Sequence, residues 1–83
     1  MSWRILLNQA SDDLDRLDEE DRQAVARELM EWVEVGPPRG TRREIAGVEL
    51  FQDLLRSGFE VVYLVNEAAP YIAILRIRRL TTD

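Results

Sequence analysis

The tripeptide Gly36-Pro37-Pro38 divides this sequence into two halves with different patterns of apolar residues. A helix cannot continue through it, because proline lacks a backbone N–H and disfavours a helical residue before it. Before this point apolar residues recur every three or four positions, and after it they alternate or form short runs. The sequence therefore predicts an α+β fold in which a helical first half is followed by a mostly antiparallel sheet.

The first half contains two predicted helices, which together form a hairpin. Ala10, Leu14 and Leu17 form the apolar stripe of the first helix, which Asn8 or Ser11 would cap. The second helix is predicted to start at an Asp18 N-cap, with Asp21 three positions later, and to end near residue 35. The residues expected on its apolar stripe are Val25, Leu29, Trp32 and Val33, with Trp3 packed nearby.

Five strands complete the expected order β-α-α-β-β-β-β, which residues 1–83 would form as one domain. Residues 59–65 carry apolar side chains on both faces, so they are expected to form a central strand. Such a sheet buries one face under the helical hairpin and leaves the other face open. The predicted strands cover residues 3–7, 41–45, 48–55, 59–65 and 71–79.

Composition excludes several kinds of chemistry. The chain has no Cys and no His, which removes disulfides, thiolate or imidazole metal sites, and Cys–His or Ser–His nucleophile systems. We expect no cofactor and no metal ion. No apolar run reaches the roughly 18 residues that span a bilayer, and no signal peptide is evident, so we expect a cytoplasmic protein with no membrane partner.

Charge is distributed unevenly along the chain. The formal net charge is −5, which argues against attraction of the whole molecule to nucleic acid. All 11 cationic side chains are arginines, and seven of them follow Gly36, whereas ten of the 16 acids precede it. The acidic run over residues 12–21 is either a docking face for a basic partner or a pair of solvated, capped helix ends.

Several strings, in this order, resemble the RelE/ParE superfamily of type II toxin–antitoxin toxins. Residues 10–17 resemble the family's A-x-x-D-L-x-x-L helix, and residues 45–51 and 58–63 resemble its strand entries. Gly36-Pro37-Pro38 and the basic closing strand at residues 72–79 fit the same layout. The resemblance implies a small βααββββ toxin that is neutralised by a cognate antitoxin wrapped over its surface. It also implies one of two targets, because RelE-like members cut mRNA in the ribosome without metal, whereas ParE-like members poison DNA gyrase.

The sequence departs from the nuclease pattern of that family at three places. Glu60 stands where the family has Arg, and Gln52 and Asp53 stand where nucleases often carry Lys or Arg. The usual Tyr or His near the end of the toxin is also missing. Acids in cationic positions would repel the scissile phosphate, so the mRNA-cleaving cluster is interpreted as degraded.

If the chain does cleave RNA, its arginines must stabilise the phosphate charge, and Glu49 or Glu60 would be the nearby candidates for a base. For Arg76, Arg78 and Arg79 the alternative is a structural role, in which they blunt a strand edge or pair with acids. The candidate catalytic residues are Arg56, Arg76, Arg78 and Arg79.

The last two predicted strands should form a hairpin that brings Glu60 next to one of these arginines. If Val65 faces Tyr71, Glu60 lies opposite Arg76, and a shift of two residues would place it opposite Arg78. Strict alternation would put residues 72, 74, 76 and 78 on one face of the last strand and residues 71, 73, 75, 77 and 79 on the other. The hypothesis is that Glu60 neutralises a cation that a nuclease would need.

Three functions follow as hypotheses. The leading one is a growth-inhibiting, toxin-like component of a type II toxin–antitoxin system, ParE-like or without nuclease activity, with a cognate antitoxin as its partner. The alternative is a non-catalytic protein-interaction module that retains the fold. The third is a ribosome-dependent mRNA endoribonuclease, which would be a metal-free enzyme. The target would be DNA gyrase or the ribosome with its mRNA, and a homodimer is also plausible for so small a domain.

Overall fold

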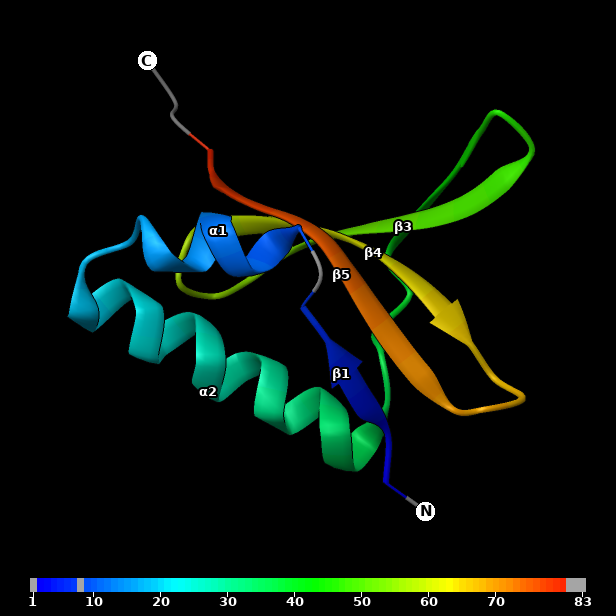
Figure 1. The fold of residues 1–83 in the computed structure, drawn as a ribbon, viewed down its shortest axis with the longest axis horizontal. Helices are drawn as coiled ribbons and strands as arrows, with labels where there is room; N and C mark the ends of the chain where they lie inside the picture. Colours follow the sequence, from blue (N-terminus) through cyan, green and yellow to red (C-terminus); the bar gives the residue numbers. More distant parts are fainter. Residues whose placement is uncertain (1, 8, 81–83) are drawn as a thin grey trace.

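A computed structural model describes residues 2–7 and 9–80. Two helices cover one face of a five-stranded sheet, and the hairpin of the second and third strands extends away from the helices (Figure 1). The order is the predicted one. The elements are β1 (Arg4–Leu6), α1 (Ala10–Asp15), α2 (Glu19–Val35), β2 (Thr41–Ile45), β3 (Val48–Leu54), β4 (Phe59–Asn66) and β5 (Tyr71–Arg79).

The strands are arranged in the order β1-β5-β4-β3-β2. β1 is parallel to β5, and all other neighbours are antiparallel. This arrangement confirms the predicted α+β class, the mostly antiparallel sheet and the central position of β4. None of the helices formed by residues 2–7 and 9–80 combines the length and apolar character that crossing a membrane requires.

Local signals explain where α2 begins and ends. Asp18 is the N-cap, and its Oδ1 accepts the backbone N–H of Asp21 at 2.9 Å, as predicted. Gly36 ends the helix with φ +90°, a conformation that side chains with a Cβ rarely adopt. The indole of Trp3 lies beside Gly36, and the Trp3 backbone N–H donates to the Val33 carbonyl at 2.8 Å. These contacts tie β1 to the end of α2.

Of the two residues predicted as the N-cap of α1, Ser11 was wrong. Ser11 lies inside the helix, whose N-cap is Gln9 with no side-chain cap hydrogen bond. The other candidate, Asn8, lies outside the described residues. α1 is instead fixed by tertiary contacts, because Ala10 is fully buried and Leu14 packs against the core.

The core lies between α2 and the covered face of the sheet. Trp32 of α2 contacts the ring of Tyr63 at a centroid distance of 4.9 Å, and Phe51, the cross-strand partner of Tyr63, stacks on the same ring at 5.7 Å. Alternate residues of β4 point into this core, which fixes the face of the sheet that the helices cover. The fully buried large side chains are Tyr63, Phe59, Ile72, Ile74, Val25 and Val61.

A β-bulge in β5 changed the predicted register. Val65 pairs with Ile72 rather than Tyr71, and Leu75 has no partner in β4, so Glu60 lies opposite Arg78. The predicted primary pairing of Glu60 with Arg76 was wrong, and the alternative with Arg78 is confirmed. Because the extra residue switches the alternation, the predicted sharing of one face by residues 72, 74, 76 and 78 was also wrong. On β5, residues 72, 74, 77 and 79 lie opposite the core-facing residues of β4, whereas Arg76 and Arg78 lie on the open face.

The two edges of the sheet are closed differently. β1 pairs only with the first three residues of β5, and α1 lies beside the rest of that strand. Asp13 of α1 takes the place of a neighbouring strand, because its Oδ2 accepts the backbone N–H of Ile77 at 2.9 Å. At the other edge, all five residues of β2 are exposed.

Candidate functional site

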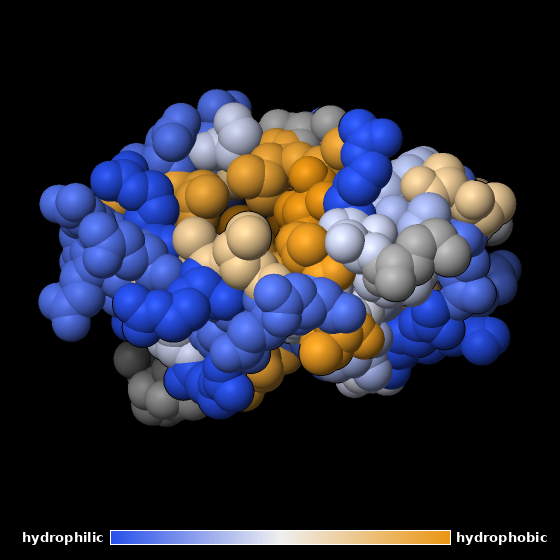
Figure 2. Space-filling view, turned by 90° about the horizontal axis from the view of Figure 1, so that it is seen from below, coloured by the Kyte–Doolittle hydropathy of each residue, from blue (hydrophilic) through white to orange (hydrophobic). Residues whose placement is uncertain are grey.

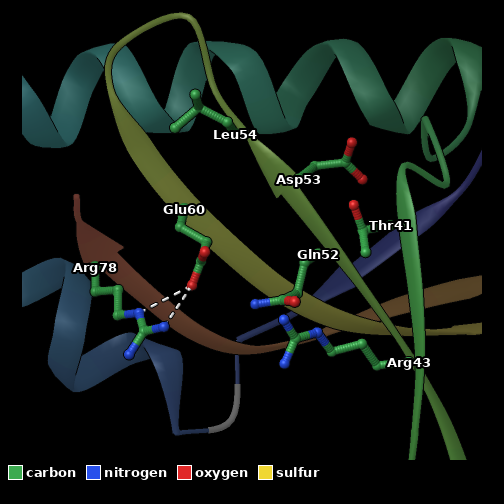
Figure 3. A pocket seen from close by; sticks show the side chains of 7 residues that line it. All are labelled: Thr41, Arg43, Gln52, Asp53, Leu54, Glu60 and Arg78. Carbon is green, nitrogen blue, oxygen red and sulfur yellow. Dashed lines mark hydrogen bonds and ion pairs between the residues drawn. The ribbon is translucent and has the colours of Figure 1, made fainter.

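The open face of the sheet carries a shallow hollow with a volume of about 360 Å³ (Figure 3). Its walls come from β2, β3, β4 and the end of β5, so residues distant in the sequence converge there through strand pairing. We call this site the open-face hollow. The residues that line it are Thr41, Arg43, Gln52, Asp53, Leu54, Glu60 and Arg78.

Glu60 and Arg78 form an ion pair at one side of the open-face hollow (Figure 3). The Arg78 Nε donates to Glu60 Oε1 at 2.9 Å, and the same oxygen lies 2.8 Å from an Arg78 terminal nitrogen. The two residues are direct cross-strand partners of β4 and β5. The structure thus confirms that Glu60 pairs with an arginine on this face, which is Arg78; that a nuclease would need this arginine stays a prediction.

Arg43 enters the hollow from the opposite side. Its side chain extends from β2 toward Gln52 of β3, with Thr41 on the same face of β2 (Figure 3). Among residues 2–7 and 9–80, Arg43 forms no ion pair, whereas Arg39 pairs with Glu67 and Arg42 pairs with Glu49. From the sequence, Arg39, Arg42 and Arg43 were either part of a basic rim or, as the favoured interpretation, a solvated loop and strand start, and nothing in the local pattern shows which of them faces the hollow.

Asp53 contributes to the hollow but its carboxylate is held from the covered face. Asp53 pairs with Val61, which is a core residue, and its Oδ2 accepts the Tyr63 hydroxyl at 2.5 Å and the Gly40 backbone N–H at 3.0 Å. Burial, together with the hydrogen bond to Asp53, raises the pKa of the Tyr63 hydroxyl well above its ordinary value. Tyr63 therefore remains a proton donor to Asp53 at neutral pH.

The four candidate arginines do not converge on one site. Only Arg78 lines the open-face hollow. Arg56 follows β3 beyond the hollow, and its guanidinium donates to both carboxylate oxygens of Glu31 at 2.8 and 2.9 Å. That hydrogen bonding to Glu31 raises the pKa of Arg56 further above its ordinary value.

The other two arginines of β5 are held by acids of the helices. Arg76 Nε lies 3.2 Å from Asp13 Oδ2 on α1. Arg79 faces the covered side, where its guanidinium lies 4.6 Å from the centroid of the Phe59 ring and 2.5 Å from Asp21 Oδ2. Parts of the acidic run at residues 12–21 therefore pair with the arginines of the second half. The catalytic role of these arginines stays a prediction.

The two candidate bases also lie apart. Glu60 lines the hollow, where it is already paired with Arg78. Glu49 alternates with Leu50 on β3, so it points to the other face of the sheet, and it pairs with Arg42 at 3.2 Å. Among the described residues, no group of three or more acids is arranged to hold a metal ion.

Glu28 is an acid that sequence analysis missed. It lies on the buried side of α2 with only 9% of its surface exposed. Its carboxylate accepts the backbone N–H groups of Arg56 at 2.6 Å and Ser57 at 3.1 Å, and the Ser57 hydroxyl at 2.7 Å. Glu28 thereby holds the β3–β4 turn against α2. Its position between Val25 and Trp32 on the apolar stripe was a readable signal, because a buried acid needs partners.

A second surface feature is an apolar groove between β1 and the two helices, with a volume of about 250 Å³. Met30 is 63% exposed at this groove. Figure 2 shows apolar side chains gathered in the middle of one face of the molecule, with hydrophilic side chains around them. We call the apolar groove between β1 and the two helices the helix-side groove, and the residues that line it are Ile5, Leu7, Leu14, Ala26, Leu29 and Met30.

The charges lining the open-face hollow cancel. Arg43 and Arg78 supply two positive charges, and Asp53 and Glu60 supply two negative charges. A site that holds a phosphodiester through a transition state needs a surplus of positive charge near the developing negative charge. Among the described residues, Arg43 is the arginine of the hollow that forms no ion pair, and it lies beside the amide of Gln52 and the hydroxyl of Thr41.

Comparison with known proteins gives matches at the level of structure. No protein-family model matches the chain, and no curated protein sequence matches it significantly. A chain of the RelBE2 toxin–antitoxin complex from Mycobacterium tuberculosis superposes with a TM-score of 0.79 at 16% identity, covering 96% of this chain and 100% of that one.

Two further solved structures are similar. A chain of the RelE–RelB complex from Pyrococcus horikoshii OT3 gives a TM-score of 0.71 at 21% identity, covering 95% of this chain and 96% of that one. The free form of an E. coli RelE mutant gives 0.68 at 20% identity, covering 95% of this chain and 84% of that one. Each alignment spans nearly the whole chain. The RelE-like toxin fold therefore includes both the sheet and the helical hairpin, and the similarity is not limited to one motif.

Proposed function

We propose that this protein is the toxin-type component of a toxin–antitoxin pair, that a cognate antitoxin binds it, and that it acts without cleaving mRNA. The RelE-like fold supports the first part, and two of the similar structures are complexes of a toxin with its antitoxin. The balanced charge of the open-face hollow carries the last part. Glu60 is the decisive residue, because it places a carboxylate next to Arg78 at the surface where cations would be needed.

The helix-side groove is the surface that we propose for the antitoxin. It is lined by apolar side chains from β1, α1 and α2. An amphipathic helix that buried its apolar face there would remove Met30 and its neighbours from water. A glutamate in place of Met30 would put a charge in that contact without disturbing the core, because Met30 is mostly exposed.

Binding is tested by co-expressing the chain with the product of the adjacent reading frame and purifying the pair. We expect a stable complex with the wild type and a loss of binding of about tenfold or more with Met30→Glu. Gln23→Glu adds the same charge to α2 outside the groove and serves as the matched control. If both variants bind as tightly as the wild type, the groove is not the binding surface.

Activity is tested by inducing the chain without its partner and by assaying RNA in ribosomes programmed with mRNA. We expect arrested growth, rescue by the antitoxin, and no cleavage of mRNA by the wild type. Glu60→Arg would convert the formal charge of the open-face hollow from zero to +2, and Glu60→Gln would convert it to +1. Strong cleavage by the wild type without metal would overturn the proposal in favour of a ribosome-dependent endoribonuclease.

A second candidate function is a protein-interaction module without toxicity. It is favoured by the pairing of all four candidate arginines with carboxylates and by the net charge of −5. Such a module would bind its partner yet leave growth unchanged when induced alone. Growth arrest relieved by the partner would exclude it. If growth stops while mRNA stays intact, a ParE-like action on DNA gyrase is the next activity to assay, by supercoiling of plasmid DNA.

A further inference from the structure

The segment that leads into β2 contains a strained residue. Arg39 has φ +55°, in the left-handed region that residues with a Cβ rarely adopt. Such a conformation persists where surrounding contacts determine it. Its side chain forms an ion pair with Glu67 in the β4–β5 loop. The backbone of Arg39 is held separately, by groups from the sheet.

A continuous chain of hydrogen bonds connects this segment to β3 and β4. The backbone N–H of Arg39 donates to the Tyr63 hydroxyl oxygen at 2.9 Å. The Tyr63 hydroxyl in turn donates to Asp53 Oδ2 at 2.5 Å, and the same oxygen accepts the backbone N–H of Gly40 at 3.0 Å. Two consecutive backbone groups are therefore fixed by one buried tyrosine and one carboxylate.

The anchor of this chain is rigid. Tyr63 is fully buried, and its ring packs against those of Trp32 and Phe51. The backbone at Gly40 approaches β3 so closely that a Cβ there would collide with the Asp53 carboxylate and lie 3.0 Å from the Gln52 carbonyl oxygen. Glycine at position 40 is thus required for Asp53 to reach the N–H group.

β2 has little packing to hold its start in place apart from this anchor. It is an edge strand with β3 as its neighbour in the sheet, and all of its residues are exposed, so little packing holds it. Arg43 lies only three residues after Gly40 and faces the open-face hollow. We propose that Tyr63 and Asp53 form a latch that fixes the start of β2 and thereby positions Arg43 over the open-face hollow.

In this arrangement Tyr63 and Asp53 are positioning residues. Neither needs to contact a bound molecule, because they act through the backbone of Arg39 and Gly40. The latch gives Asp53 a role different from repelling phosphate, which is the role that sequence analysis assigned to it. It also does not depend on whether the chain is a toxin, since it concerns the placement of one strand.

The first test is amide hydrogen exchange at neutral pH and well below the unfolding temperature. Tyr63→Phe removes only the hydroxyl group, and Tyr71→Phe makes the same change at the other tyrosine of the chain. We expect protection over residues 39–45 to fall about tenfold in Tyr63→Phe, while protection in β4 and β5 stays close to wild type. Tyr71→Phe should leave residues 39–45 unchanged.

A uniform loss of protection across all strands would show that the hydroxyl contributes only to global stability, and this would overturn the proposal. Unchanged protection at residues 39–45 would overturn it as well. A comparison of Asp53→Asn with Asp53→Ala gives a second measure of the latch, because an amide oxygen can still accept both hydrogen bonds and a methyl group cannot. The Asp53→Asn variant should lose less protection at residues 39–45 than Asp53→Ala, and an equal loss in the two variants would contradict the latch.

The second test follows Arg43 directly. The chain has no cysteine, so a single Arg43→Cys substitution can carry a nitroxide spin label without competing sites. Its spectrum should sharpen, as the label becomes more mobile, when Tyr63→Phe is added. The same label at Gln23→Cys on α2 should give identical spectra with and without Tyr63→Phe. A label at position 43 that does not respond to loss of the hydroxyl would contradict the proposed positioning.

Discussion

Asp53 and Glu60 are acids on neighbouring strands, yet the two faces of the sheet use them differently. The Asp53 carboxylate is bound from the covered side by a backbone N–H and by a hydroxyl on a buried side chain. Glu60 lies on the open side, where its partner is the long and largely exposed side chain of Arg78. Asp53 therefore fixes the fold in addition to lining the hollow, whereas Glu60 mainly sets the charge that a partner meets.

The sharpest way to test this difference compares two adjacent valines of β4. Val61 is fully buried under the helices and Val62 is only partly buried on the open face. We expect Val61→Ala to lower the free energy of unfolding by about 2–3 kcal/mol through lost burial and a cavity, and Val62→Ala by about 1 kcal/mol or less. Denaturant unfolding followed by circular dichroism measures both. Equal losses would contradict the one-sided core.

The clamp made by Glu28 should give the next largest effect. Glu28→Gln keeps the volume of the side chain but weakens its hydrogen bonds to the Arg56 and Ser57 backbone. We expect a loss of about 1.5–3 kcal/mol in the free energy of unfolding. Glu31→Gln makes the same change at an exposed position and should cost under about 1 kcal/mol. A small effect at Glu28 would mean that the β3–β4 turn holds its place without the clamp.

The buried Tyr63 hydroxyl on the covered side should also make the stability of the protein depend on pH at high pH. In the unfolded chain a tyrosine loses its proton near pH 10, whereas burial and Asp53 hold the pKa of Tyr63 above that value in the folded chain. The unfolded state therefore binds fewer protons above about pH 10, and the free energy of unfolding should fall by up to about 1.4 kcal/mol per pH unit.

Few other side chains titrate in this pH range, because the chain has no Lys and no Cys and only two tyrosines. Urea unfolding at closely spaced pH values between about 9 and 11.5 would measure the slope. Tyr63→Phe should flatten the fall in stability, and Tyr71→Phe should retain it. A wild type whose stability is constant across this window would show that Tyr63 titrates in the folded state as it does in the unfolded chain.

The smallest effect on stability is expected at the open face. Glu60→Gln breaks an ion pair whose arginine is 59% exposed, so it should change the free energy of unfolding by under about 1 kcal/mol, and by still less at high salt. Thermal unfolding at low and high ionic strength would measure it. A loss as large as that from Glu28→Gln would show that Glu60 also fixes the fold, and the distinction between the two faces would fail.

Sequence reasoning predicted most of the fold because its signals were local. The Asp18 cap, the stop at Gly36 and the apolar residues on both faces of residues 59–65 are signals within a few residues, and the structure confirms the cap, the helix end and the central strand that they predict. The bulge at Leu75 could not be predicted in this way, because it depends on how β5 fits both β4 and α1. That one residue decided which of the arginines in β5 reach the open face.

The candidate site was predicted less completely for a related reason. The pairing of Glu60 with an arginine of β5 followed from the hairpin, and only the register had to be corrected. Arg56 and Arg79 were grouped with Arg78 because they are near basic or turn residues in the sequence, yet strand direction sends them elsewhere. Arg43 was interpreted as a solvated strand-start residue, because the contacts that hold positions 39–40 involve residues that are 13 and 24 positions away in the chain.

The unequal closing of the two sheet edges has a consequence for association with other extended chains. Near α1, Asp13 already occupies an N–H group of β5 that an incoming strand would need. β2 presents its backbone along a fully exposed strand, so growth of the sheet by an added segment is directed to that side. Because β2 carries Arg42, Arg43 and Glu44, an incoming strand would meet charged side chains along this edge, which discourages indiscriminate aggregation.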